Sequence, residues 1–139
     1  MNYLLDTSVI SELTAKQPNR RVVQWIDTID PQSVYLSVIT IGQLRKGIEK
    51  LPDSKRKDTL RDWLDTDLLL RFSGRILILD IAVMLTWGML TGQLERARKS
   101  LSAIDSLIAA LAVHHNYTLV TRNEDDFKAT SIMLINPWK

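Results

Sequence analysis

The chain has 139 residues, which is enough for one domain with a substantial hydrophobic core. Apolar residues make up 45% and charged residues 24%, and no run of eighteen apolar residues could span a membrane, so we expect no membrane partner. Zero cysteines exclude disulfides and thiolate metal sites, and the formal charge of +2 keeps overall electrostatics mild. The N-terminus lacks a signal pattern, so we expect a cytoplasmic protein.

Short apolar runs alternate with helical patterns along the whole chain. In chain order, we expect strand Asn2–Leu5, helix Ser8–Leu13, helix Asn19–Ile29, strand Val34–Ser37 and helix Ile39–Lys50. We then expect helix Pro52–Phe72, strand Arg75–Leu79, helix Ile81–Arg98, a helix from Ser102 to about His115, and strands Leu119–Thr121 and Ile132–Leu134. This alternation predicts an α/β fold with a central parallel sheet of about five strands and helices on both faces.

The helix expected at Ile81–Arg98 is almost entirely apolar in its first three turns. Its periodicity predicts that Ala82, Leu85, Met89 and Leu94 line the buried side.

Three carboxylates occupy related positions in this pattern. Asp6 ends the first strand, Asp126 follows the fourth strand, and Asp105 lies in the first turn of an apolar helix. The carboxyl ends of parallel strands meet at one edge of a sheet, where α/β proteins bind their ligands. Converging carboxylates repel one another and need a cation, and Mg²⁺ prefers oxygen ligands. The sequence therefore predicts a magnesium-type site at this edge.

Each acid also has a structural explanation that needs no metal. Asp6 can cap the helix that follows it, and Asp105 lies three residues after Ser102, the spacing of a capping box. Asp125 and Asp126 can be solvated loop residues. The shared placement of the acids favours the metal site over separate explanations. Asp105 contributes most to this inference, because the helix it begins must be largely buried, where an unpaired charge is costly.

Four segments resemble, in order, the sequence motifs of PIN domains. They are residues 4–12 (LLDTSVISE), 38–47 (VITIGQLRKG), 103–109 (AIDSLIA) and 119–127 (LVTRNEDDF). The resemblance covers essentially the whole chain and is closest to the single-domain VapC-type toxins, including the FitB-like branch. It implies that residues 1–139 form a single domain with a three-layer α/β fold.

The resemblance also implies a function. PIN-domain toxins of this type are Mg²⁺- or Mn²⁺-dependent endoribonucleases, and Asp6, Asp105 and Asp126 match the positions of their metal-binding acids. The implied substrate is tRNA or another structured RNA. The implied partners are a cognate antitoxin that blocks the enzyme, DNA only through the toxin–antitoxin complex, and a second copy of the chain in a homodimer.

Gln43 stands where the second family motif has glutamate, so the implied catalytic set is Asp6, Gln43, Asp105 and Asp126. A glutamine amide oxygen binds a cation weakly and supplies no negative charge, so we expect an inactive or attenuated enzyme. Two explanations are open: an engineered substitution that silences a toxic enzyme, and a natural attenuated member. The rest of the motif is family-like, which favours one targeted change. The alternative interpretation is that Gln43 is an ordinary exposed helix residue with no role in a metal site.

Other residues are candidates for supporting roles. Ser8 can cap the first helix or contact bound water, Thr121 ends the fourth strand, and Asn123 can contact a neighbouring carboxylate. Glu12 is more readily a solvated helix residue than part of the site. Weaker candidates for binding RNA phosphates are Arg45, Lys46 and Arg122.

Two other classes of function fit less of the sequence. A chain with Gln43 can keep the fold, the dimer and the antitoxin groove without catalysis, and act as a co-repressor of its operon. A phospho-acceptor receiver domain also combines a parallel sheet with an acid cluster that binds Mg²⁺. Its acceptor aspartate follows the third strand, where this chain has Asp80 leading directly into a helix.

Overall fold

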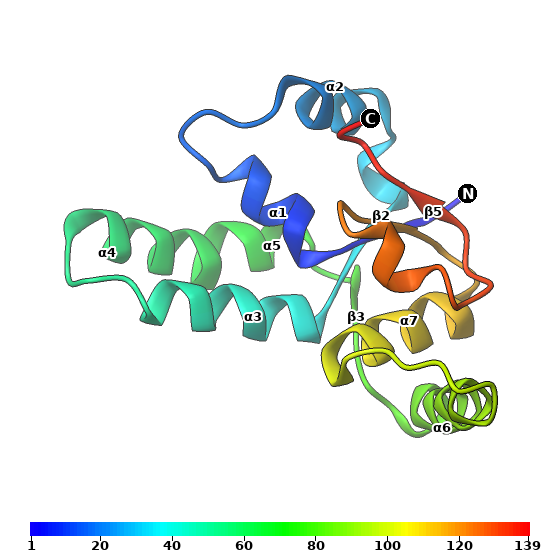
Figure 1. Cartoon of the computed structure of the whole chain (residues 1–139). Helices are drawn as coiled ribbons and strands as arrows, with labels where there is room; N and C mark the ends of the chain where they lie inside the picture. The colour runs from blue at the N-terminus through cyan, green and yellow to red at the C-terminus, as the bar shows by residue number, and fades with distance from the viewer.

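The computed structural model describes residues 1–139 and contains one five-stranded parallel sheet (Figure 1). The strands are β1 (Tyr3–Leu5), β2 (Val34–Ser37), β3 (Ile76–Leu77), β4 (Thr118–Val120) and β5 (Leu134–Ile135). Their order across the sheet is β3-β2-β1-β4-β5, and every neighbouring pair is parallel. The expected α/β class with a five-stranded parallel sheet is confirmed.

Helices cover both faces of this sheet (Figure 1). They are α1 (Thr7–Leu13), α2 (Arg20–Thr28), α3 (Val38–Glu49), α4 (Lys55–Asp62), α5 (Leu69–Arg71), α6 (Ile81–Arg96) and α7 (Ala103–His115). Three short segments are helical but not α-helical: η1 (Pro31–Ser33), η2 (Trp63–Leu68) and η3 (Glu124–Phe127).

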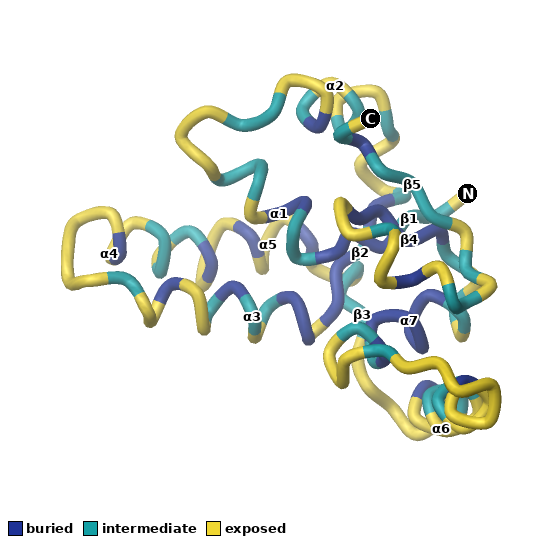
Figure 2. Tube along the Cα trace, viewed as in Figure 1, coloured by how far each residue is buried: buried dark blue, intermediate teal, exposed yellow.

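Two adjacent leucines of β1 show how the layers form. Successive side chains of a strand point to opposite faces, so Leu4 and Leu5 enter different cores, and neither is more than 1% exposed. Leu5 packs with residues of α1, α2 and the α4–α5 segment. Leu4 packs with α7 and with Phe127 of η3. The darkest parts of the chain in Figure 2 therefore follow the central strands and α7.

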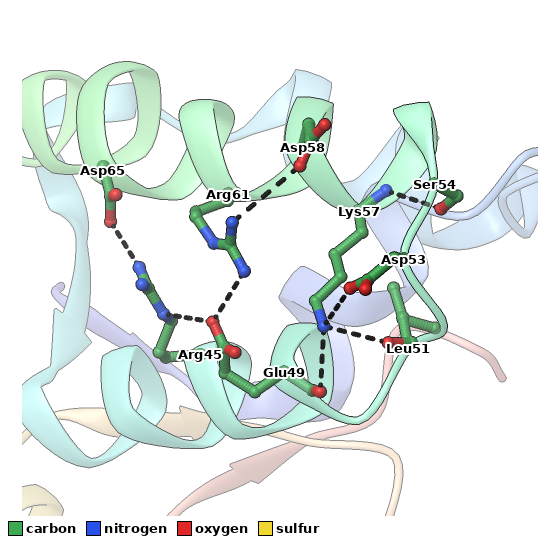
Figure 3. Close-up of polar contacts among 9 residues, drawn as sticks. All are labelled: Arg45, Glu49, Leu51, Asp53, Ser54, Lys57, Asp58, Arg61 and Asp65. Carbon is green, nitrogen blue, oxygen red and sulfur yellow. Dashed lines mark hydrogen bonds and ion pairs between the residues drawn. The ribbon is translucent and has the colours of Figure 1, made fainter.

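The α3–α4 hairpin extends away from the sheet and is held by polar contacts (Figures 1 and 3). Glu49 of α3 accepts from Arg45 at 3.0 Å and from Arg61 of α4 at 3.1 Å. Lys57 is buried, and its ammonium group donates to the backbone carbonyls of Glu49 at 3.2 Å and Leu51 at 3.0 Å. Lys57 thus satisfies carbonyls at the end of α3 that have no helical partner.

The helix predicted at Pro52–Phe72 is present, but it begins later. Ser54 caps it by accepting from the backbone N–H of Lys57 at 3.1 Å, so the helix starts at Lys55. It continues without interruption through α4, η2 and α5, and η2 is a π-helical stretch. Nothing in the local sequence marks this change of hydrogen-bond pattern, which the sequence analysis did not predict.

Two predicted strands have different boundaries in the structure. The strand expected at Arg75–Leu79 is reduced to β3, because only two of its residues pair, with Leu36 and Ser37 of β2. The strand expected at Ile132–Leu134 lies later in the chain, as β5, where it pairs with β4. Apolar character identified both segments, but only the neighbouring strand determines which of their residues form the ladder.

The predicted buried face of α6 is largely wrong. Leu94 is buried as expected, but Ala82 is exposed, Leu85 is 71% exposed and Met89 is 55% exposed; Val83 is fully buried instead. The helix is apolar on all sides, so periodicity could not select the side that packs on α7. It also ends at Arg96, two residues earlier than expected. Despite this apolar character, no helix in the structure is long and apolar enough to cross a membrane.

Replacing Lys57 tests the hairpin contact. Lys57→Met keeps the aliphatic packing but leaves the Glu49 and Leu51 carbonyls without this donor, so we expect a loss of about 1–3 kcal/mol in the free energy of unfolding. Urea unfolding followed by circular dichroism measures it. Lys55→Met is the matched control, because Lys55 is exposed on the same helix; equal effects of the two substitutions would contradict the assigned role.

Candidate active site and metal centre

Asp6 lies at the carboxyl end of β1 and is only 6% exposed. One carboxylate oxygen accepts from the backbone N–H of Thr7 at 2.8 Å, and the other accepts from the hydroxyl of Thr121 at 2.7 Å. Asp6 therefore does cap α1, as the alternative explanation proposed. The cap does not exclude a second role, because all donors to this carboxylate are neutral and its negative charge has no counter-ion within the chain.

Gln43 reaches the same region from α3. Its side-chain oxygen accepts from the hydroxyl of Thr7, and the hydroxyls of Thr7 and Thr40 lie 3.0 Å apart. Thr7 also donates its backbone N–H to Asp6, so a single residue connects positions 6 and 43. Gln43 is half-buried and is not an ordinary exposed helix residue. Sequence reasoning missed Thr7 and Thr40, because a threonine inside a helix carries no signal of such a contact.

Asp105 and Asp126 complete the acidic region. Burial raises the pKa of the Asp105 carboxyl, hydrogen bonding with Ser102 lowers it, and the charges of Asp6 and Asp126 raise it further. The net pKa lies above the ordinary aspartate value. The charges of Asp6 and Asp126 both act on Asp105, so the three predicted acids influence one another electrostatically. Asp125 belongs elsewhere, because Lys128 lowers the pKa of its carboxyl by a direct contact.

The residues fit a hard cation held mainly through water. None of the three acids forms an ion pair within the chain, whose ion pairs all involve other carboxylates. No three or more His, Cys, Asp or Glu side chains are close enough together to hold one metal ion directly. Mg²⁺ commonly takes one or two protein carboxylates and keeps several waters. An all-oxygen acidic region without a counter-ion is consistent with that kind of binding.

The predicted supporting residues surround Asp6 in different ways. Thr121 is fully buried, and besides donating to Asp6 it accepts from the backbone N–H of Asn123 at 3.0 Å. Ser8 is not the helix cap, because it lies inside α1; its hydroxyl lies 3.4 Å from the Asp6 carboxylate and accepts from the Arg122 N–H at 3.4 Å. The side chain of Asn123 forms no hydrogen bond with a carboxylate.

Glu12 is neither solvated nor part of the site. Its two carboxylate oxygens accept from the backbone N–H of Asn19 and from the indole N–H of Trp138, each at 3.1 Å. It thereby joins α1 to the start of α2 and to the C-terminal segment.

The three predicted phosphate-binding residues have different environments. Arg45 is held by Glu49 and by Asp65, each at 3.0 Å, so its charge is compensated within the hairpin (Figure 3). Arg122 lies over the ring of Trp138, with 5.5 Å between the guanidinium carbon and the ring centroid. Lys46 is exposed and forms no ion pair. Of the three, only Lys46 has a charge that no other side chain of the chain engages.

The raised pKa of Asp105 predicts a pH-dependent stability. A carboxyl with a raised pKa in the folded state favours folding below the ordinary pKa of aspartate, about 4, and that contribution is lost as pH rises through the folded-state value. In EDTA at pH 7, Asp105→Asn should therefore unfold at a higher urea concentration than the parent, and the difference should shrink below pH 4. Exposed Asp62→Asn is the control. A less stable Asp105→Asn protein at pH 7 would contradict the raised pKa of Asp105 in the folded protein.

Comparisons with known proteins identify the family of the chain. The PIN domain family model matches residues 3–132. The chain is 40% identical to Toxin FitB of Neisseria gonorrhoeae, over 97% of both chains, and 36% identical to VapC ribonuclease Y4jK of Sinorhizobium fredii, over 98% of this chain and 97% of that protein. The solved structure of FitAB bound to an IR36 DNA fragment matches with a TM-score of 0.93 at 38% identity, covering 99% of this chain and 96% of that chain. The chain therefore belongs to the PIN-domain family.

Proposed function

We propose that residues 1–139 act as one domain, in the cytoplasm, as the toxin of a type II toxin–antitoxin pair that cleaves RNA with Mg²⁺ or Mn²⁺. The observation that carries this proposal is the set of three acids without counter-ions, Asp6, Asp105 and Asp126, at the carboxyl edge of the sheet. Relatives that share almost the full length are a named toxin and a named ribonuclease, which supports the same activity here.

Each acid has its own part in such a site. A divalent cation would stabilise the charge that develops on phosphorus and would lower the pKa of a water molecule. Thr121 and the backbone of Thr7 hold the Asp6 carboxylate in one orientation, so it is pre-arranged. Asp105 carries an unfavourable charge, since burial and its neighbours raise its pKa, and a cation would relieve it. Asp126 adds charge from the exposed η3 segment.

Gln43 is the weak point of this site. Its carboxamide oxygen accepts a hydrogen bond from the Thr7 hydroxyl, as a glutamate carboxylate would. The carboxamide, however, adds no negative charge. The shape of the site is thus compatible with glutamate, while its electrostatics are those of an attenuated enzyme.

Gln43→Glu should therefore increase Mg²⁺-dependent cleavage of total cellular RNA by about a hundredfold, the usual scale for a positioned catalytic group. It should also tighten Mn²⁺ binding, measured by calorimetry. Gln24→Glu, on α2, is a matched control for added charge and should change neither quantity. Growth arrest on expression of Gln43→Glu without antitoxin is the corresponding result in cells.

The alternative is a binding subunit without catalysis, which pairs with a DNA-binding antitoxin and represses the operon. The structural relative FitAB is seen bound to DNA, which favours an antitoxin partner and contact with DNA through the complex in either case. If Gln43→Glu is folded and free of antitoxin yet cleaves no RNA and arrests no cells, the nuclease proposal is wrong and the alternative replaces it.

The outward face of α6 supports the expected homodimer. Ile81, Leu85 and Met89 are 81%, 71% and 55% exposed, and no charged residue lies between Asp80 and Glu95. Soluble monomers rarely expose a continuous apolar patch of this kind. The face is uncharged over about four helical turns, which suits another uncharged helix better than an acidic or basic partner.

The face is also complementary to itself. Gly88 and Gly92 have open space where a Cβ would stand, so the rest of the chain gives no packing reason for either glycine. Glycine costs a helix interior about 1 kcal/mol relative to alanine, and close approach of a second helix would explain it. Asp80 and Arg96 each lie eight residues from Gly88. Two antiparallel copies of α6 that cross at Gly88 therefore place the Asp80 end of each helix beside the Arg96 end of its partner.

Charge reversal tests this pairing in the antitoxin-free protein. Asp80→Lys and Arg96→Asp should each raise the dimer dissociation constant at least tenfold, because like charges then meet at both ends of the helix pair. A mixture of the two variants should associate more tightly than either alone, since the heterodimer restores opposite charges at both ends. Analytical ultracentrifugation measures each case.

Asp80 also caps α6 by accepting from the Val83 N–H at 2.9 Å, so Asp80→Asn, which keeps a capping side chain, controls for local unfolding. A mixture that dimerises no better than its components would overturn the assignment of this face.

A further inference from the structure

A groove of about 470 Å³ lies beside Gln43, between α3 and the start of α7. Its lining includes Val38, Gly42, Gln43, Lys46, Lys50 and Ile104. It lies beside the acidic region, because Gln43 contacts Thr7 next to Asp6, and Ile104 precedes Asp105. Any molecule in this groove would be continuous with a substrate at the acids. We call it the α3–α7 groove.

The groove is positively charged. Lys46 and Lys50 lie one helical turn apart, both are exposed, and neither forms an ion pair or a side-chain hydrogen bond within the chain. No acidic residue lines the groove. The nearest acid in sequence, Glu49, is engaged by Arg45 and Arg61 in the hairpin network instead. The two lysines are thus available to an anion.

The groove also has an apolar part and room near the helix backbone. Val38 is 36% and Ile104 is 39% exposed, although both are apolar and lie next to the acidic region. Gly42 and Gly47 have nothing within 4 Å of the position that a Cβ would take. A bulky group can therefore approach the α3 backbone closely. Cationic and apolar surface together match a nucleotide, whose phosphate is charged and whose base has an apolar face.

We propose that the α3–α7 groove binds the nucleotide next to the cleaved phosphodiester, with the base against Val38 and Ile104 and its phosphate on Lys46 and Lys50. This inference rests on the proposed ribonuclease function. The volume of the α3–α7 groove falls within the range of small-ligand sites.

Binding can be measured on the protein as it exists, because EDTA removes the divalent cation that the proposed cleavage needs. Fluorescence anisotropy with a labelled single-stranded RNA oligonucleotide in EDTA should show that Lys46→Gln and Lys50→Gln each weaken binding about three- to tenfold. Each should reduce the slope of log affinity against log salt by about one. Gly42→Leu, which fills the groove without changing charge, should weaken binding about tenfold. Lys55→Gln, exposed on α4, should leave affinity and slope unchanged.

The outcomes separate this subsite from the activity itself. Equal effects of Lys46→Gln and Lys55→Gln would overturn the subsite, because binding would then follow net charge alone. Loss of antitoxin binding by the groove variants, with RNA affinity unchanged, would also overturn it. In the Gln43→Glu background, the groove variants should raise KM more than they lower kcat. Weakened RNA binding by the groove variants, together with no cleavage by Gln43→Glu, would support the subsite and refute the nuclease.

Discussion

The hydrogen bond from Thr121 to the Asp6 carboxylate is the contact on which the rest of the site depends. The two residues are 115 positions apart in the chain, and the parallel pairing of Leu5 with Val120 brings them together. A buried carboxylate without donors would cost several kcal/mol. A register slip of one residue would turn the Thr121 side chain to the other face of the sheet, and the Asp6 carboxylate would lose its main side-chain donor. Correct pairing of the two central strands therefore stabilises the site, and the buried acid favours correct pairing.

The carboxylates of the chain have two kinds of electrostatic environment. Glu49 is contacted by Arg61 and Arg45, Glu124 by Lys139 and Asp125 by Lys128, and in each case the contact lowers the carboxyl pKa. At the carboxyl edge of the sheet the opposite holds: the pKa of Asp105 is raised, and no basic side chain contributes to lowering it. Basic residues are plentiful elsewhere, so this is a local arrangement. It lowers the stability of the empty protein and favours a cation, as expected where function competes with stability.

The sequence predicted the features that depend on order along the chain. Strand and helix alternation predicted the sheet, and Asp6 and Thr121 were both predicted to lie at strand ends, although their direct contact was not predicted. Features that depend on packing were missed. The hydrogen bond between Thr7 and Gln43 joins α1 to α3. The ion pair that keeps Arg45 from binding a phosphate requires Asp65 from a neighbouring helix. An evenly apolar helix such as α6 has no periodicity from which its buried side can be inferred.

Arg45 and Lys46 show how one helix serves two purposes. Adjacent residues of an α-helix point about 100° apart, so neighbours of similar charge reach different surroundings. Arg45 points into the hairpin, where Glu49 and Asp65 engage it, and it stabilises the packing of α3 against α4. Lys46 points into the α3–α7 groove with Lys50, where no acid competes for it. Because Arg45 pairs with Glu49 and Asp65 inside the hairpin, neither of these acids is available to the lysines of the groove. The network drawn in Figure 3 therefore engages the acids of the hairpin and leaves the groove side of α3 positive.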